Sequence, residues 1–203
     1  MPIFRTKYSS NSEERLTNRR RILGIDPGSR LTGFGVLDFV ADKPSYVACG
    51  TVKSLDGTFP DRLKRIYVSV GEIVAEYKPD VIAVETVFMA RNAGSALKLG
   101  QARSAALCAS FAFDVDVYEY APREIKQAVV GYGAAEKKQL QHMVKLLLSL
   151  DAAPSPHDAA DALAVAICHA HICGASLTPP PSRTPRHQRS WRHTRVPQRR
   201  QLS

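Results

Sequence analysis

The chain has 203 residues, which suits one domain with terminal extensions, and 44% of them are hydrophobic, which is enough for a core. No apolar run approaches the roughly 20 residues that a membrane-spanning helix needs. The N-terminus also lacks the apolar centre of a secretory signal, so we expect a cytoplasmic protein.

The formal net charge of +9 is distributed unevenly along the chain. Residues 174–203 contain seven arginines and no acid, a charge of +7, and residues 1–21 carry +4. The segment between them, 22–173, is therefore left with a charge of −2. The basic balance belongs to the ends of the chain, so net charge is no argument that the folded core binds nucleic acid.

We predict three segments from these patterns. Residues 1–20 form a disordered polar and basic extension, 21–173 form the folded domain, and 174–203 form a disordered tail rich in Arg and Pro. The tail would act either as a loose polycation on a phosphate backbone or as a solvated end without a role, and its composition does not separate the two.

The first part of the domain reads as a meander of three strands. Residues 21–26 form a short buried strand, and the Pro and Gly of 27–30 predict a turn. Residues 32–39 form a second strand, whose glycines allow close approach of another backbone, and 45–53 form a third. Short connections make these strands antiparallel neighbours.

The rest of the domain alternates helical and strand patterns. An amphipathic helix over 60–77 is followed by a strand at 81–85 that is apolar on both faces and therefore central. The remaining elements are a small-residue helix at 94–112, a strand at 115–120, and helices at 122–130, 135–150 and 157–172. The order predicts an α/β fold with a mixed five-stranded sheet flanked by helices.

The four cysteines show no disulfide spacing. The run from Cys168 to Cys173 includes two histidines, but its spacing is not that of a zinc site and no second pair accompanies it. We interpret this run as the frayed end of the last helix.

Four carboxylates lie at positions typical of a catalytic or metal-binding site, at the ends of two strands and at the start of a helix. Asp26 and Glu85 each close an apolar strand, and Asp158 and Asp161 lie three apart at the start of the last helix, on one face. Ligands in open α/β sheets gather beyond the carboxyl ends of strands, so the four acids converge if that helix crosses the strand ends. Asp26 has an ordinary alternative as a turn former, and Asp158 and Asp161 have one as helix N-terminal acids. Glu85 is the hardest to explain otherwise, because Glu is disfavoured at the end of a central strand.

Converging acids cannot all ionise unless cations separate them. Two Mg²⁺ ions would satisfy the cluster and clamp a phosphodiester, and Mn²⁺ would substitute, whereas zinc prefers histidine and cysteine. His157 precedes Asp158 and would order water or assist proton transfer, although a solvent-facing histidine is the more ordinary interpretation.

Long ordered motifs in residues 21–173 resemble the RuvC-type Holliday-junction resolvases, the crossover junction endodeoxyribonucleases. The matching stretches are Ile22 to Arg30 with Thr32 to Val36, Glu85 to Asn92, Ser95 to Arg103, Lys126 to Gly131, Glu136 to Met143, and Asp158 to Ala164. The two terminal segments fall outside the resemblance.

The resemblance implies an RNase H-like fold and a homodimer that nicks four-way junction DNA symmetrically, in two strands of like polarity, with Mg²⁺. It assigns catalysis and metal binding to Asp26, Glu85, Asp158 and Asp161. It also implies the branch-migration complex RuvAB as a partner. The DNA-binding residues that go with it are Phe88, Arg91, Lys126, Lys137 and Lys138. From the residues alone, Phe88 would equally be a core side chain and the lysines a solvated helix face.

Two rival functions remain from the sequence. The Asp-x-Gly turn between the first strands also resembles the phosphate loop of sugar kinases and actin-like ATPases, but those need two such domains. A non-catalytic nucleic-acid module is the second rival, and the presence of all four acids argues against it.

Overall fold

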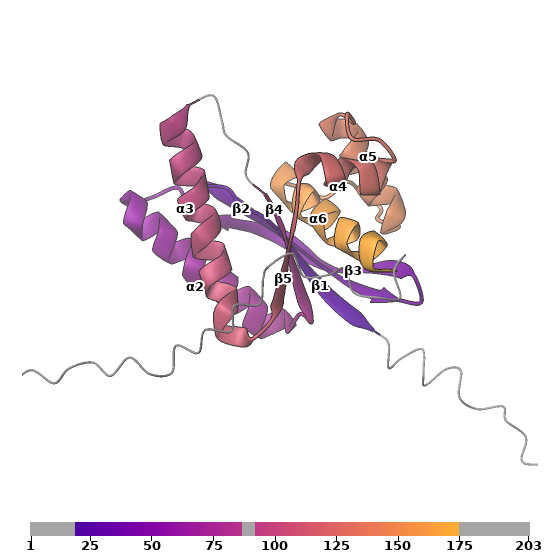
Figure 1. The fold of residues 1–203 in the computed structure, drawn as a ribbon, viewed down its shortest axis with the longest axis horizontal. Coiled ribbons are helices and arrows are strands. Elements are labelled where there is room, and N and C mark those ends of the chain that lie inside the picture. The colour runs from indigo at the N-terminus through magenta and orange to yellow at the C-terminus, as the bar shows by residue number, and fades with distance from the viewer. Residues whose placement is uncertain (1–18, 87–91, 175–203) are drawn as a thin grey trace, which may run out of the picture.

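A computed structural model describes residues 19–86 and 92–174 (Figure 1). Its centre is a five-stranded sheet in the order β3-β2-β1-β4-β5. The strands are β1 (Arg20–Asp26), β2 (Leu31–Val40), β3 (Lys43–Lys53), β4 (Val81–Glu85) and β5 (Asp116–Tyr120). The first three are antiparallel neighbours, whereas β4 runs parallel to β1 and to β5, so the predicted meander and mixed sheet are confirmed.

Helices cover both faces of the sheet, because its central strands are apolar on both sides. Alternate residues of β1 and β4 enter different cores: Ile22 and Val81 face one, and Leu23 and Ile82 face the other. The helices α2 (Phe59–Tyr77) and α3 (Ala93–Ser110) pack on one face, with the short 3-10 helix η1 (Phe111–Phe113) after α3. The other face carries α4 (Pro122–Val130), α5 (Lys137–Leu147) and α6 (His157–Gly174) (Figure 1).

The last helix is enclosed between the sheet and the helices α4 and α5. Every residue from Ala162 to Ala170 is buried, and most of them are small or aliphatic. Strands β1 and β2 place glycines directly under this helix, and a Cβ at Gly24 would overlap the carbonyl oxygen of Ala162. Gly35 meets Leu163 in the same way. Close contact between backbones therefore fixes the height of α6 above β1 and β2.

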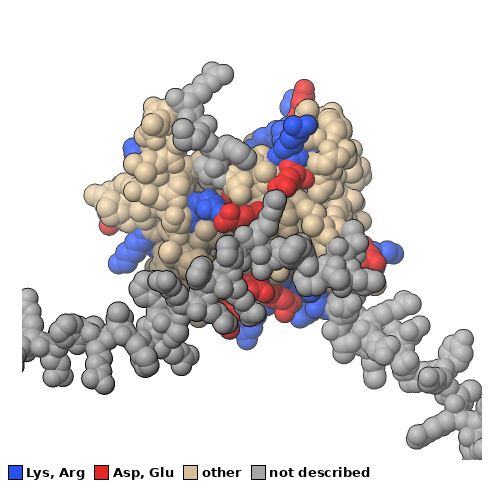
Figure 2. Space-filling model, in the orientation of Figure 1, with Lys and Arg blue, Asp and Glu red and all other residues tan. Residues whose placement is uncertain are grey.

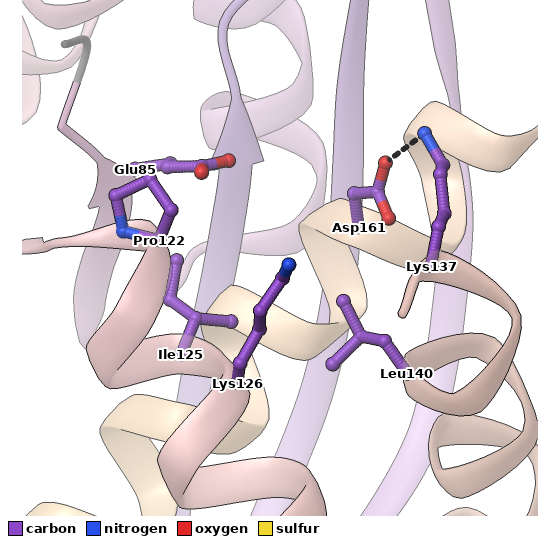
Figure 3. Close-up of a pocket in the computed structure, with 7 residues that line it drawn as sticks. All are labelled: Glu85, Pro122, Ile125, Lys126, Lys137, Leu140 and Asp161. Carbon is purple, nitrogen blue, oxygen red and sulfur yellow. Dashed lines mark ion pairs between the residues drawn. The ribbon is translucent and has the colours of Figure 1, made fainter. Parts of the chain in front are cut away.

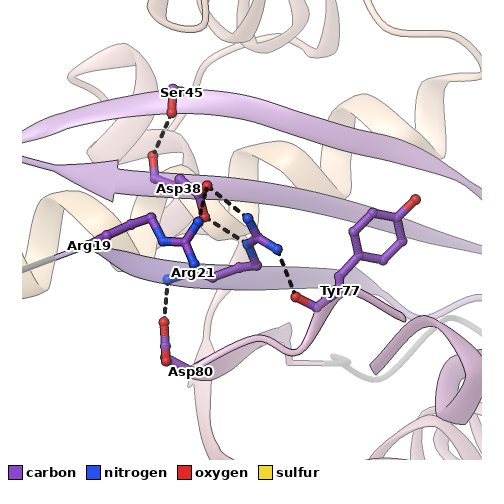
Figure 4. A network of polar contacts seen from close by, with 6 residues as sticks. All are labelled: Arg19, Arg21, Asp38, Ser45, Tyr77 and Asp80. Carbon is purple, nitrogen blue, oxygen red and sulfur yellow. Dashed lines mark hydrogen bonds and ion pairs between the residues drawn. The ribbon is translucent and has the colours of Figure 1, made fainter. Parts of the chain in front are cut away.

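The end of the sheet where β1 begins is fastened by a polar network (Figure 4). The guanidinium of Arg21 donates two hydrogen bonds to Asp38 on β2, at 2.8 and 3.0 Å, and a third to the carbonyl oxygen of Tyr77 at 3.0 Å. The backbone nitrogen of Arg21 donates to Asp80, ahead of β4, at 2.6 Å. These bonds tie the start of β1 to both neighbouring strands and to the end of α2.

Asp38→Asn should lower the free energy of unfolding by about 1–2 kcal/mol at pH 7, because it removes a charge-assisted, two-pronged contact that is only partly exposed. The hydrogen bond from Arg21 holds the pKa of Asp38 below its ordinary value, against the opposing effect of burial. A lowered pKa stabilises the fold above the ordinary value and ceases to do so as the pH falls through the lowered one.

The difference between parent and Asp38→Asn should therefore shrink at pH 3, as urea unfolding at the two pH values would measure. Asp42→Asn, at the exposed turn between β2 and β3, is the matched control and should change little. An equal loss at pH 7 and pH 3 would show that the charge of Asp38 is not what stabilises the network.

The structure corrects three details of the predicted elements. The helix expected over 135–150 is shorter, Lys137–Leu147, and α3 ends at Ser110 rather than 112 because η1 takes over. The frayed helix end expected from Cys168 onward is wrong, because Cys168 and His169 are buried inside α6. His169 bonds the hydroxyl of Tyr120 at 2.8 Å, so this run packs against β5. Within the described part of the chain, no helix is both long and apolar enough to cross a membrane.

Candidate active site

Asp26 and Glu85 end two adjacent parallel strands at the same edge of the sheet. The register pairs Ile25 with Val84, so the next two residues along the strands are these two acids. Side chains alternate along a strand, and both acids fall on the face that α6 covers, since Gly24 contacts α6 and Ala83 belongs to the α6-side core. Both are half-buried. The prediction that each of these acids closes an apolar strand is confirmed, and the structure shows that the two strands are neighbours.

The glycine contacts of α6 bring its first turn to the same edge. Gly33, which pairs with Asp26 across β1 and β2, lies directly under Asp158, and a Cβ there would overlap the Asp158 carbonyl oxygen. Asp161, one turn further along α6, lines a pocket together with Glu85 (Figure 3). Both aspartates of the helix are half-buried. The four acids thus come from three separate elements and meet at one end of the sheet.

The charges of the other three acids act on Asp26. Burial, followed by the negative charges of Glu85, Asp161 and Asp158, raises the pKa of Asp26 to about 8. Burial also raises the pKa of Glu85, although a hydrogen bond with Asp26 and the nearby lysines oppose that rise. Burial and mutual repulsion thus favour the protonated form of this pair of carboxyls when no cation is bound.

Two lysines face these acids from the helices α4 and α5. Lys126 and Lys137 line the pocket with Glu85 and Asp161, and its floor is apolar: Pro122, Ile125 and Leu140 (Figure 3). Lys137 Nζ lies 2.6 Å from Asp161 Oδ2. On the face shown in Figure 2, acidic and basic side chains lie side by side between the two helix layers. The site can therefore bind both cations and phosphate oxygens.

The donor set fits hard divalent cations. It consists of carboxylates whose mutual repulsion a cation would relieve, and Lys137 already supplies one positive charge to Asp161. As the side chains stand, no three His, Cys, Asp or Glu residues among those described are close enough together to hold an ion. The acids are gathered at one place, and side-chain rotation is still needed to make them a ligand set.

The turn that follows Asp26 is held from three sides. Thr32 donates its hydroxyl to the carbonyl oxygen of Gly28 at 3.0 Å, and the buried hydroxyl of Ser54 lies 3.2 Å from the carbonyl oxygen of Arg30. Arg62, from α2, bonds the carbonyl oxygen of Ser29. These contacts fix the backbone beyond Asp26, and the sequence offered no local signal for Arg62, which lies in another element.

The remaining predicted residues have mixed outcomes. Phe88 and Arg91 lie outside the described residues. Lys138 is exposed at the start of α5, beside Lys137, and does not line the pocket. His157 is exposed as expected, but its Nδ1 bonds the side-chain amide of Gln141 on α5. The sequence could not predict this contact, because nothing in it shows that α5 and α6 are neighbours.

The metal-free protein should lose stability as the pH rises. A raised pKa stabilises the fold fully below the ordinary value, here 3.8, and this contribution falls until the pH passes the folded value of about 8. Thermal unfolding in a chelator at pH 5, 6.5 and 8.5 should show this fall, and Asp26→Asn should reduce it. If the variant has the same slope as the parent, Asp26 is not the group that binds the proton.

Comparison with known proteins identifies the family of this chain. The sequence profile of the family named crossover junction endodeoxyribonuclease RuvC matches residues 22–169. A relative of that name from Azoarcus sp. (strain BH72) is 56% identical over 151 residues, which are 74% of this chain and 82% of the relative.

Solved structures of junction resolvases are also similar to this chain. Thermus thermophilus RuvC, solved in complex with Holliday junction substrate, is 37% identical with a TM-score of 0.72, over 76% of this chain and 94% of that one. The yeast mitochondrial resolvase Ydc2 shares the fold at 15% identity and a TM-score of 0.56, over 75% of this chain and 79% of that one. The fold is the RNase H-like fold that the sequence predicted, and this chain belongs to the RuvC family of crossover junction endodeoxyribonucleases.

Proposed function

We propose that this chain resolves four-way DNA junctions by cutting two strands of like polarity, with Asp26, Glu85, Asp158 and Asp161 as its catalytic and metal-binding residues. As a member of its family it is an endodeoxyribonuclease, a hydrolase of phosphodiester bonds that acts in recombination and repair. The observation that carries the residue assignment is the meeting of three elements at one sheet edge, where burial and the neighbouring acids raise the pKa of Asp26.

Each group at this edge has a chemical task. The four carboxylates would hold two Mg²⁺ ions, or Mn²⁺ in their place, and such ions supply an activated water and stabilise the leaving oxygen. Asp26 must give up its proton before it can bind a cation. Lys126 and Lys137 would bind phosphate oxygens of the strand being cut, and Lys138 would contact the backbone from outside the pocket. The short β1–β2 turn, held by Arg62, keeps Asp26 from shifting.

The wider assembly follows from the family. A homodimer would present two such sites to the two-fold junction, and the small-residue helix α3 offers a surface for close packing against a second copy. Phe88 would wedge or stack against bases at the crossover, with Arg91 on the backbone. RuvAB is the expected partner on the junction, and a cytoplasmic location goes with that substrate.

The direct test is a nicking assay on three substrates. A mobile four-way junction, a plain duplex and an RNA–DNA hybrid of the same sequence are offered to the full chain, each with and without Mg²⁺. We expect paired nicks in the junction only, and only with the metal. Cutting of the hybrid in preference to the junction would point to a different nuclease of the same fold.

The Arg-rich tail gives a separate prediction. If residues 174–203 bind phosphates, their removal should flatten the dependence of junction affinity on salt, because fewer counterions are released on binding. Binding titrations between about 50 and 200 mM salt would measure the slope. A tail in which all seven arginines are replaced by glutamine separates charge from length. An unchanged slope in both variants would mean that the tail does not contact DNA.

A further inference from the structure

A positive charge already faces the carboxylates, and it binds an oxygen that the proposed metal site requires. Lys137 Nζ lies 2.6 Å from Asp161 Oδ2, on the side of the pocket opposite Glu85 (Figure 3). The charges of Asp158 and Asp26 also attract this ammonium. A divalent cation bound to Asp161 would repel this ammonium, so the cation and Lys137 compete for the carboxylate.

We propose that Lys137 alternates between Asp161 and a DNA phosphate: it holds Asp161 while DNA is absent, and on binding DNA it releases that carboxylate to a divalent cation. This inference rests on the proposed function and adds to it a control over when the site accepts metal. The phosphate replaces the carboxylate as the anion beside Lys137, so no charge is left unpaired at any stage.

The exposure of the two side chains suits this exchange. The side chain of Lys137 is 54% exposed, whereas that of Asp161 is only 17% exposed. Lysine has a flexible four-carbon stem, so its ammonium can turn toward the pocket mouth without repacking the core. Asp161 stays in place on an enclosed helix and remains available to the cation.

A second contact between the same two helices keeps them together during the exchange. Gln141 on α5 bonds His157 on α6, and these residues lie four positions from Lys137 and Asp161 respectively, one turn away on each helix. Leu140 lies between Lys137 and Gln141 in the sequence, and its buried side chain packs in the core shared with α6. The exchange is therefore a movement of one side chain and not of α5.

Thermodynamic linkage gives the exchange a measurable consequence. If Lys137 competes with metal for Asp161, the parent binds metal weakly without DNA, and removing the competitor strengthens that binding. Coupling between two sites typically amounts to a factor of about 5–150. The same variant loses a phosphate contact, so tighter metal binding is accompanied by slower cutting.

The experiment is calorimetric titration of Mn²⁺ into the full chain without DNA. Lys137→Met should bind Mn²⁺ about 5–50 times more tightly than the parent, and Lys137→Gln should behave alike. Lys137→Arg keeps the ion pair and should stay close to the parent. Lys138→Met, the exposed neighbour on α5, is the matched control and should change affinity less than about twofold. In the nicking assay, Lys137→Met should also cut more slowly than the parent.

The outcomes separate this inference from the assignment of the metal site. Unchanged or weaker Mn²⁺ binding by both Lys137→Met and Lys137→Gln would overturn the exchange. Asp161→Asn addresses the assignment instead, since it should lose Mn²⁺ affinity whatever Lys137 does. If that variant binds Mn²⁺ as the parent does, Asp161 is not a ligand and the proposed metal site is wrong at that position.

Discussion

Asp26→Asn is expected to slow Mg²⁺-dependent nicking of a four-way junction on the order of 10³-fold or more while leaving junction binding within a few-fold of the parent. Asparagine keeps the shape of the side chain but offers the cation a neutral oxygen in place of a charged one. The lysines of the pocket, Lys126 and Lys137, remain to bind phosphate. Single-turnover cutting and equilibrium binding, measured on the same junction, separate the two effects.

The loss should not come from unfolding. Asp26 is a half-buried acid crowded by three others, so its replacement should stabilise the metal-free fold at pH 8. We expect a rise in melting temperature of about 2–6 °C in the presence of a chelator. The control Asp42→Asn, on an exposed turn, should cut like the parent. Cutting by Asp26→Asn at the parent rate would remove Asp26 from the active site.

Gly24→Ala should be a strongly damaging substitution in the sheet. Its methyl group would overlap the carbonyl oxygen of Ala162 and crowd the backbone nitrogen of Ala166, and neither backbone atom can rotate away. The free energy of unfolding should fall by about 2–4 kcal/mol. Activity should fall further, on the order of 10²-fold at a temperature where the variant is folded, because α6 carries Asp158 and Asp161.

The matched control is Gly71→Ala, inside α2. A Cβ at Gly71 meets nothing within 4 Å, so the same substitution should raise the free energy of unfolding by about 0.5–1 kcal/mol, as alanine does inside a helix. Urea unfolding of both variants tests the pair. If Gly24→Ala is as stable and as active as the parent, the contact between β1 and α6 is looser than the structure indicates.

The strands, the antiparallel meander of the first three and the central place of β4 could be predicted because local patterns determine them. The apolar runs that end at Asp26 and Glu85 are continuous because helices cover both faces of β1 and β4, and the short turns after β1 and β2 force antiparallel pairing. Once two strand ends are adjacent, the acids that close them must be close together. The location of the site at this edge therefore follows from local sequence.

Contacts between distant elements could not be predicted in this way. The glycines of β2 indicated close approach of a backbone, but not that the approaching backbone is that of Asp158. The pair of Lys137 and Asp161 joins two helices, and no periodic pattern relates them. The Cys168 to Cys173 run does lie in the last turns of α6, but its first part is not frayed, because Cys168 and His169 are buried and His169 bonds Tyr120 of β5.

The direction of α6 has a practical consequence for labelling. This helix begins at the carboxylates with His157 and runs 18 residues to Gly174, about 27 Å away, while β1 starts at the far end of the sheet and leads toward the acids. The described part of the chain therefore begins and ends at the end of the sheet that lies opposite the carboxylates. A fluorophore attached at Arg19, the exposed first described residue, would therefore lie at the opposite end of β1 from Asp26, where it could report on DNA binding without touching the carboxylates.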